Sequence, residues 1–129
     1  MNPLVQILLV GAGGFLGAIS RFLVSRGVNG MLGTAFPWGT FIINVSGSFL
    51  LAFIATLAAE RLIPYPDVWR LSIAIGFVGA YTTFSTFEYE TNTLLEDGSW
   101  LPALANVAGS VIAGFIALKI GIALAKRLC

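Results

Sequence analysis

Charged residues are absent from long stretches of this chain, and this pattern restricts its fold more than any other feature. No Asp, Glu, Lys or Arg occurs in residues 27–59, 71–87 or 98–118. A bilayer hydrocarbon core about 30 Å thick is crossed by a helix of roughly 20 mainly apolar residues. The uncharged stretches are therefore predicted to be membrane spans.

The composition agrees with a membrane protein and argues against other classes. Of the 129 residues, 57% are hydrophobic and only 10% are charged, far from the makeup of a water-soluble domain. A net charge of +1 with no basic run gives no reason to expect nucleic-acid binding. The single cysteine, Cys129, and the absence of histidine make disulfide, redox and transition-metal chemistry unexpected.

The chain is long enough for about four membrane helices, so we expect residues 1–129 to form a single transmembrane domain. The helices are expected at about 4–25, 38–59, 68–95 and 100–126. The first lacks the charged start of a signal peptide and is expected to be retained. Tryptophans mark the expected membrane interfaces, at Trp38, Trp69 and Trp100.

The third expected helix contains a cluster of glycine, hydroxyl and aromatic residues, from Gly79 to Phe87. We expect the helix to break near 79–83, at about mid-membrane depth. Lipid cannot satisfy the polar backbone groups that a break exposes, so it must be buried in protein or line a polar cavity. Function is often located at such breaks.

Polar residues recur every four positions in two of the expected helices. Thr40, Asn44 and Ser48 share one face of the second, and Asn106 and Ser110 share one face of the fourth. These stripes either join helices through hydrogen bonds, at about 1 kcal/mol or less each, or line a path. Because they carry donors and no carboxylate, a path between them favours an anion.

Four further residues each have two interpretations. Phe84 and Phe87 are either ordinary core aromatics or rings whose positive edges solvate a small, partly dehydrated anion. Arg21 either extends to the lipid headgroups or attracts anions at a vestibule. Glu90 is either a solvated carboxylate like Glu88 or a functional group near the break; of the two glutamates it is the better functional candidate.

Three motifs occur in order along the chain: GGFLGAISR at 13–21, PWGTFIIN at 37–44 with Gly47 following, and GAYTTFSTF at 79–87. On the basis of these motifs, the chain resembles the Fluc or CrcB family of small bacterial fluoride channels over essentially its whole length. The last motif is highly specific, whereas the first two would be weak alone.

The resemblance implies an all-α integral membrane protein with four transmembrane helices, the third broken, that assembles as an antiparallel homodimer. It implies multi-pass insertion into the lipid of the bacterial cytoplasmic (inner) membrane, with dual topology. The implied function is that of a fluoride-selective channel that passively exports cytoplasmic fluoride and so lowers its toxicity, with two pores per dimer.

The resemblance also implies roles for particular residues. Asn44, Phe84, Phe87 and Ser110 correspond to pore residues, and Glu90 to a glutamate near the pore end. One structural sodium ion is implied at the dimer centre, held by backbone carbonyls. The expected sodium ligands are Gly79 and Thr82, and the full expected fluoride pore comprises Asn44, Phe84, Phe87, Ser110, Thr40, Asn106, Glu90 and Arg21.

Two residues depart from the family pattern, and one charge bias conflicts with it. Asn106 stands where some relatives have tyrosine, and Ala80 where a second glycine is frequent. Basic residues on the N-terminal side outnumber Arg21 and Arg26 opposite, which by itself predicts a single orientation with the N-terminus inside. The residues on that side are Arg61, Arg70, Lys119, Lys126 and Arg127.

Two other classes of membrane protein remain as alternatives. A small proton-coupled multidrug or cation exporter normally needs a buried carboxylate in an early helix, and no Asp or Glu precedes Glu60. A non-transporting subunit would use the polar stripes for packing alone. An enzyme is not expected, because no nucleophile is paired with a base.

Overall fold

The protein consists of helices joined by short turns, in a computed structural model that describes residues 1–128; Cys129 lies outside the described residues. No strand occurs in this range, which confirms the expected all-α fold. The elements are α1 (Pro3–Leu32), α2 (Trp38–Ala59), α3 (Pro66–Trp69), the π-helix η1 (Arg70–Val78), α4 (Gly79–Tyr81), α5 (Phe84–Glu96) and α6 (Trp100–Lys126).

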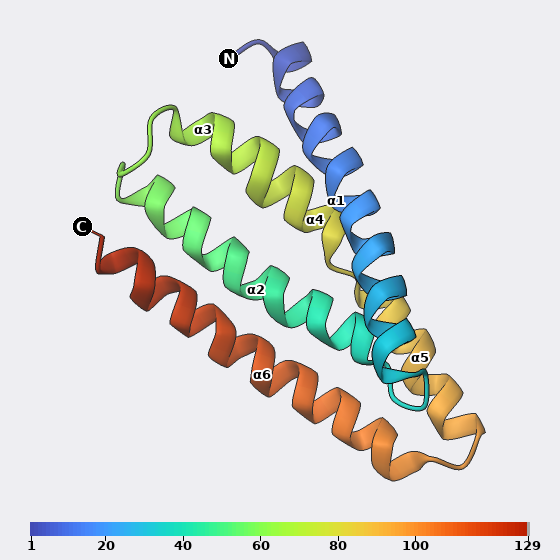
Figure 1. Ribbon diagram of the computed structural model, residues 1–129. Coiled ribbons are helices and arrows are strands. Elements are labelled where there is room, and N and C mark those ends of the chain that lie inside the picture. Colours follow the sequence, from blue (N-terminus) through green and yellow to red (C-terminus); the bar gives the residue numbers. More distant parts are fainter. Residues whose placement is uncertain (129) are drawn as a thin grey trace.

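α2, the segment 66–96 and α6 run roughly alongside one another, while α1 crosses them at an angle (Figure 1). Both ends of the chain lie toward the same end of the molecule (Figure 1). α1, α2 and α6 are each long and apolar enough to cross a membrane. Between α2 and α6 the chain forms one interrupted helical segment, 66–96, whose halves meet beside the middle of α1 and α2 (Figure 1).

The first helix is longer than the sequence indicated. It begins where Asn2 caps it, the Asn2 Oδ1 accepting from the Leu4 amide at 2.9 Å, and it continues past residue 25 to Leu32. Gly27 and Gly30 lie between the expected first and second helices, yet they do not end α1, because a glycine costs a helix only about 1 kcal/mol. The helix stops at Gly33, whose φ of 79° suits a residue without a Cβ.

Glycines let α1 approach the π-helix η1 at backbone distance. A Cβ at Gly76 would lie 2.6 Å from the Val10 carbonyl oxygen. A Cβ at Gly13 or Gly17 would overlap the backbone carbonyls of Ser72 or Phe77. This small-residue contact fixes the position of η1, and therefore of the break that follows it.

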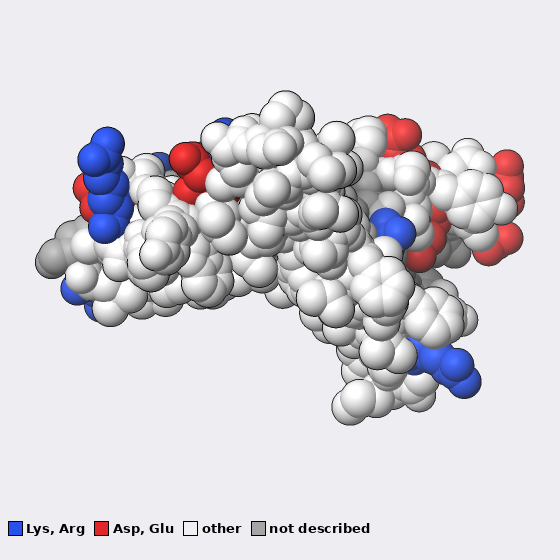
Figure 2. All heavy atoms as spheres, turned by 90° about the horizontal axis from the view of Figure 1, so that it is seen from above, with Lys and Arg blue, Asp and Glu red and all other residues white. Residues whose placement is uncertain are grey.

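α2 and α6 form the other close pair. Gly121 of α6 packs on the α2 backbone, where its Cβ would lie 2.6 Å from the Phe49 carbonyl oxygen. Ile43 of α2 and Asn106 of α6 are each only 1% exposed. Elsewhere large apolar side chains face outward, and charged side chains gather mainly toward the ends of the molecule (Figure 2).

Candidate functional site

The chain leaves the helical conformation at two adjacent threonines. Thr82 (φ −77°, ψ 154°) and Thr83 (φ −149°, ψ 115°) are extended, and β-branched threonine suits this conformation. Thr83 then caps α5, its Oγ1 accepting from the Thr86 amide at 3.3 Å. The break therefore falls inside the expected range 79–83.

Asn44 of α2 satisfies the peptide groups exposed at this break. Its Oδ1 accepts from the Thr83 N–H at 2.8 Å, and its Nδ2 donates to the Thr83 carbonyl at 3.1 Å. The Thr83 amide would otherwise continue the helical ladder to the carbonyl of Gly79. Asn44 thus replaces a helical hydrogen bond and leaves the end of α4 with free carbonyls.

Two neighbours of Asn44 hold the residues before Thr83. The Ser46 Oγ donates to the Ile42 carbonyl at 2.6 Å and lies 3.0 Å from the Tyr81 hydroxyl. Since Ser46 has a single proton, Tyr81 is the donor in the second bond. Gly47 faces Thr82 so closely that a Cβ there would overlap the threonine methyl group. One turn of α2 therefore positions the whole break.

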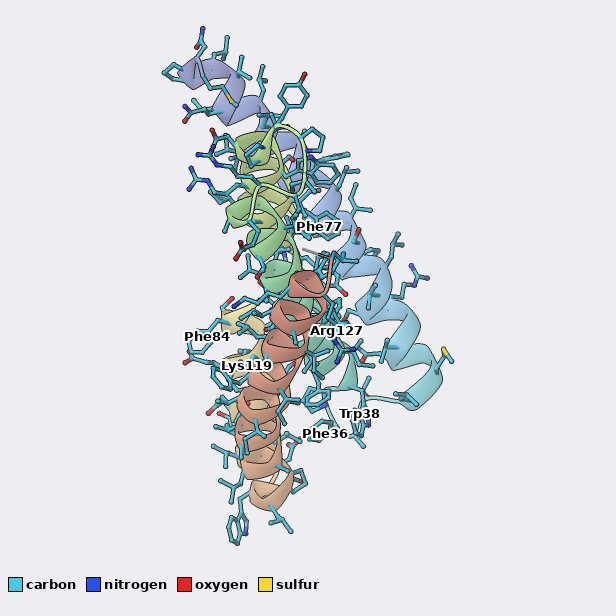
Figure 3. All side chains as sticks on the ribbon, turned by 90° about the vertical axis from the view of Figure 1, so that its left-hand side faces the viewer. Phe36, Trp38, Phe77, Phe84, Lys119 and Arg127 are labelled. Atoms are coloured by element: carbon cyan, nitrogen blue, oxygen red, sulfur yellow. The ribbon has the colours of Figure 1, made fainter. Side chains whose placement is uncertain are left out.

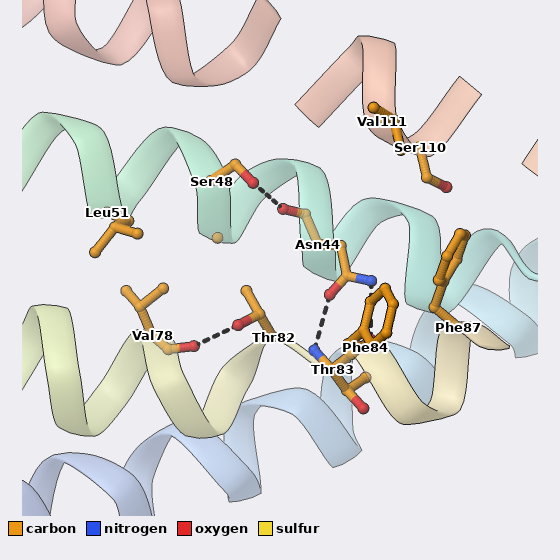
Figure 4. A pocket seen from close by; sticks show the side chains of 11 residues that line it. Asn44, Ser48, Leu51, Val78, Thr82, Thr83, Phe84, Phe87, Ser110 and Val111 are labelled. Atoms are coloured by element: carbon orange, nitrogen blue, oxygen red, sulfur yellow. Dashed lines mark hydrogen bonds between the residues drawn. The ribbon is translucent and has the colours of Figure 1, made fainter. Parts of the chain in front are cut away.

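A cavity of about 290 Å³ opens at the break, between α2, the end of η1, α5 and α6 (Figure 4). None of the described residues that line it is charged. They are Asn44, Gly47, Ser48, Leu51, Val78, Thr82, Thr83, Phe84, Phe87, Ser110 and Val111. Of the eight expected pore residues, four meet in this cavity: Asn44, Phe84, Phe87 and Ser110.

Most hydroxyl protons of the cavity are used within the protein. Ser48 donates to the Asn44 carbonyl at 2.8 Å, and Thr82 donates to the Val78 carbonyl at 2.8 Å (Figure 4). Ser110 donates to Asn106 Oδ1 at 3.3 Å. The Asn44 Nδ2 carries two protons, and the second has no partner among residues 1–128. That N–H is a donor available to a ligand.

The two phenylalanines form one wall of the cavity. Their ring centroids are 5.9 Å apart, with 37° between the planes. Phe87 is half-buried, whereas Phe84 is 71% exposed and projects away from the rest of the chain (Figure 3). Their arrangement can present positive ring edges to an anion.

Asn106 lies behind the cavity and does not line it. It is 1% exposed, and its Nδ2 donates to Thr91 Oγ1 of α5 at 2.9 Å. Thr91 in turn donates to the Phe87 carbonyl at 2.7 Å. Ser110, Asn106 and Thr91 thus connect α6 to the backbone beside Phe87.

The other expected pore residues line two further cavities. Arg21 and Thr40 line one of about 380 Å³ between α1, α2 and α5. Glu90 lines another, of about 510 Å³, at the end of the molecule where α2 begins. Thr40 is the polar side chain that faces the Glu90 carboxylate, while Glu90 Oε2 is buried without a hydrogen-bond partner. Thr83 lines both the Arg21 cavity and the cavity at the break.

The end of α4 offers oxygen ligands to a cation. The last carbonyls of a helix have no partner within that helix and carry its negative dipole end. Gly79 is exposed, with open space where its Cβ would be. The expected sodium ligands, Gly79 and Thr82, are therefore chemically suited to a hard cation.

A profile of the family described as "CrcB-like protein, Camphor Resistance (CrcB)" matches residues 8–122 of the chain. The chain belongs to the CrcB-like protein family. The expected membership is thus confirmed, and the matched range includes the break, the three cavities and every expected site residue of this CrcB-like chain.

Individual CrcB-like relatives match over nearly the whole chain. A protein of Solibacter usitatus (strain Ellin6076) named "Fluoride-specific ion channel FluC" is 43% identical, with 95% of this chain and 100% of the relative covered. A namesake from Chlorobaculum tepidum is 48% identical, with 94% of each covered. Another, from Methylococcus capsulatus, is 45% identical over 96% of this chain but 54% of its own length.

Sequence reasoning did not identify three residues that support the site of this CrcB-like chain: Ser46, Tyr81 and Thr91. Ser46 carried a usable signal, because it is polar within an apolar helix but lies off the stripe of Thr40, Asn44 and Ser48. Such residues commonly bond to a neighbouring helix. Thr91 had no comparable signal, since hydroxyl residues precede and follow it throughout α5.

Proposed function

We propose that this protein is a fluoride-selective ion channel through which cytoplasmic fluoride leaves the cell passively, so that its toxicity is lowered. The cavity at the break carries the proposal, because it combines an available amide donor, two phenylalanine rings and no charged side chain among its described lining residues. The relatives named above support the identity of the ion. They are named as ion channels, and no enzymatic activity is proposed.

A pore for a small anion has to replace part of its hydration shell and still release it. The free N–H of Asn44 and the edges of Phe84 and Phe87 are the proposed ligands. Neutral donors bind an anion more weakly than a fixed cation does, which suits rapid passage. Ser110 extends this path along α6.

The remaining expected pore residues are proposed to act at the ends of the path. Arg21 attracts anions into its cavity, where Thr40 and Thr83 also lie. Glu90 has a carboxylate oxygen without a hydrogen-bond partner. It is proposed to control the passage of anions through its own cavity by way of Thr40. Asn106 does not line the cavity at the break, and is proposed to act on the path through its hydrogen bond with Ser110.

We propose four membrane crossings: α1, α2, the interrupted segment 66–96, and α6. The hydrogen bonds from Asn44 support the third crossing, because they satisfy the interrupted backbone inside protein. An even number of crossings agrees with both chain ends lying at one end of the molecule. The proposed location is the bacterial cytoplasmic (inner) membrane.

An antiparallel homodimer with two pores is the proposed assembly. It is supported by Phe84, a pore candidate that is 71% exposed in the single chain, and by the open space around Gly79. A second copy would enclose both. A sodium ion at the dimer centre would supply positive charge that holds the carbonyls of Gly79 and Thr82 together.

The test is fluoride efflux from liposomes, compared with chloride efflux. Phe84→Ile removes a ring that projects from the single chain, so it should leave the fold intact. With the dimer shown by cross-linking to be retained, the expected loss of efflux reports on conduction. Phe15→Ile, at a 66% exposed site on α1, is the matched control and should conduct normally. No efflux from folded wild-type protein would reject the channel. Transport that requires a proton gradient and Glu90 would favour the small proton-coupled exporter.

A further inference from the structure

Three consecutive hydrogen bonds connect the cavity to the α5 backbone. The Ser110 Oγ donates to Asn106 Oδ1 at 3.3 Å, the Asn106 Nδ2 donates to Thr91 Oγ1 at 2.9 Å, and Thr91 donates to a backbone carbonyl at 2.7 Å. Only the first of these residues lines the cavity.

The direction of this chain of bonds is fixed from its far end. The Phe87 carbonyl can only accept, so it takes the single proton of Thr91. The Thr91 oxygen is then an acceptor, and the nitrogen of the Asn106 amide must face it. The oxygen of that amide therefore faces Ser110, which has to donate.

This direction matters because an anion needs protons. Ser110 directs its only proton at Asn106 and leaves its lone pairs for the cavity. Ser48 and Thr82 also give their protons away, but to carbonyls of their own helices. Ser110 alone among these three is held by a side chain that another residue orients.

We propose that Asn106 is a positioning residue that competes with the permeating anion for the proton of Ser110 and so keeps the affinity of the cavity low. This inference rests on the proposed function. An anion at Ser110 must first break the bond to Asn106, which costs about a factor of five in affinity, the usual net worth of a neutral hydrogen bond. A weaker site releases its ion faster.

The first experiment measures the fluoride concentration at which flux is half-saturated. Asn106→Leu keeps the side-chain volume and frees the Ser110 proton, so this concentration should fall about fivefold. Thr91→Val should lower it too, because the amide can then turn its nitrogen toward Ser110. Thr91→Ser keeps the hydroxyl and is the matched control, with no change expected.

A background of Ser110→Ala separates positioning from simple loss of structure. In this background Asn106→Leu should no longer shift half-saturation, because no proton remains to compete for. A damaged fold would reduce the maximal flux instead, with or without Ser110. An unchanged or raised half-saturating concentration in Asn106→Leu, or the same shift in both backgrounds, overturns the proposal.

The bond network is also measurable without any flux. The chain has five asparagines, so the side-chain amide signal of Asn106 can be assigned in a nuclear magnetic resonance spectrum from its loss in Asn106→Leu. Ser110→Ala and Thr91→Val should each shift that signal, and fluoride added to the wild type should shift it as well. If the Asn106 amide signal does not move, the positioning role of Asn106 is rejected, even where fluoride efflux supports the channel. If the signal moves but no efflux is measured, only the channel function is rejected.

Discussion

The side-chain amide of Asn44 pairs with both polar groups of the Thr83 residue, at 2.8 Å and 3.1 Å. This pairing imitates the exchange of N–H and C=O hydrogen bonds between two neighbouring β-strands, and Thr83 is in the extended conformation that such pairing needs. It lets the chain leave the helical conformation within the segment 66–96 while both polar groups of Thr83 stay hydrogen-bonded. Both Asn44 and Thr83 line the cavity at the break.

Asn44→Asp should destabilise the break. It keeps an acceptor for the Thr83 N–H but sets a carboxylate oxygen against the Thr83 carbonyl. A buried acceptor left without a donor costs about 1–3 kcal/mol, which unfolding in mixed micelles would measure. Asn2→Asp is the matched control, because aspartate caps α1 as well as asparagine does. Equal stability of both variants would refute the role given to Asn44.

Tyr81→Phe and Ser46→Ala should each lower the free energy of unfolding by about 1 kcal/mol, because either change removes the same hydroxyl bond. The double variant should lose less than the sum, which a double-mutant cycle detects. Tyr65→Phe, at a hydroxyl-bearing ring that is 79% exposed, should have little effect. Strict additivity of the two changes would exclude the bond.

Gly17→Ala should destabilise the protein by about 1–3 kcal/mol, the usual cost of overpacking. A Cβ at this position overlaps the Phe77 carbonyl, so α1 and η1 would have to separate. Gly11→Ala introduces the same methyl group on the same helix where nothing lies within 4 Å. A thermal unfolding series should therefore rank Gly17→Ala well below Gly11→Ala; the reverse order would contradict the helix contact.

Gly79→Ala should weaken dimerisation while leaving the single chain intact. No atom of the chain lies within 4 Å of the added Cβ, so any effect reports on a partner. Cross-linking at falling protein-to-detergent ratios measures the dimer, with Gly30→Ala as the control at another open position. Gly79→Ala should also reduce the dependence of thermal stability on sodium. Unaltered dimerisation and sodium dependence would argue against carbonyls of this region meeting at the dimer centre.

The ends of two helices followed from the sequence. The expected ranges 38–59 and 100–126 coincide with α2 and α6, because tryptophans and charged loops mark membrane interfaces strongly. The end of α1 did not follow, since glycine weakens a helix by too little to stop it. The break followed from its composition, because glycine, hydroxyl and aromatic residues cluster at 79–87 within a mainly apolar, uncharged stretch.

The sequence by itself determined that this chain crosses a membrane, where a helix breaks, and which uncharged residues gather near that break, because lipid imposes strict rules on charge and backbone. Only the tertiary structure decided what those residues do to one another. Asn44 and Thr83 are 39 positions apart, and whether they bond depends on the rotation of each helix about its axis. Close backbone contacts at Gly13, Gly17 and Gly121 set that rotation. These residues have no Cβ, so the helices can approach closely only where a glycine faces the neighbouring backbone.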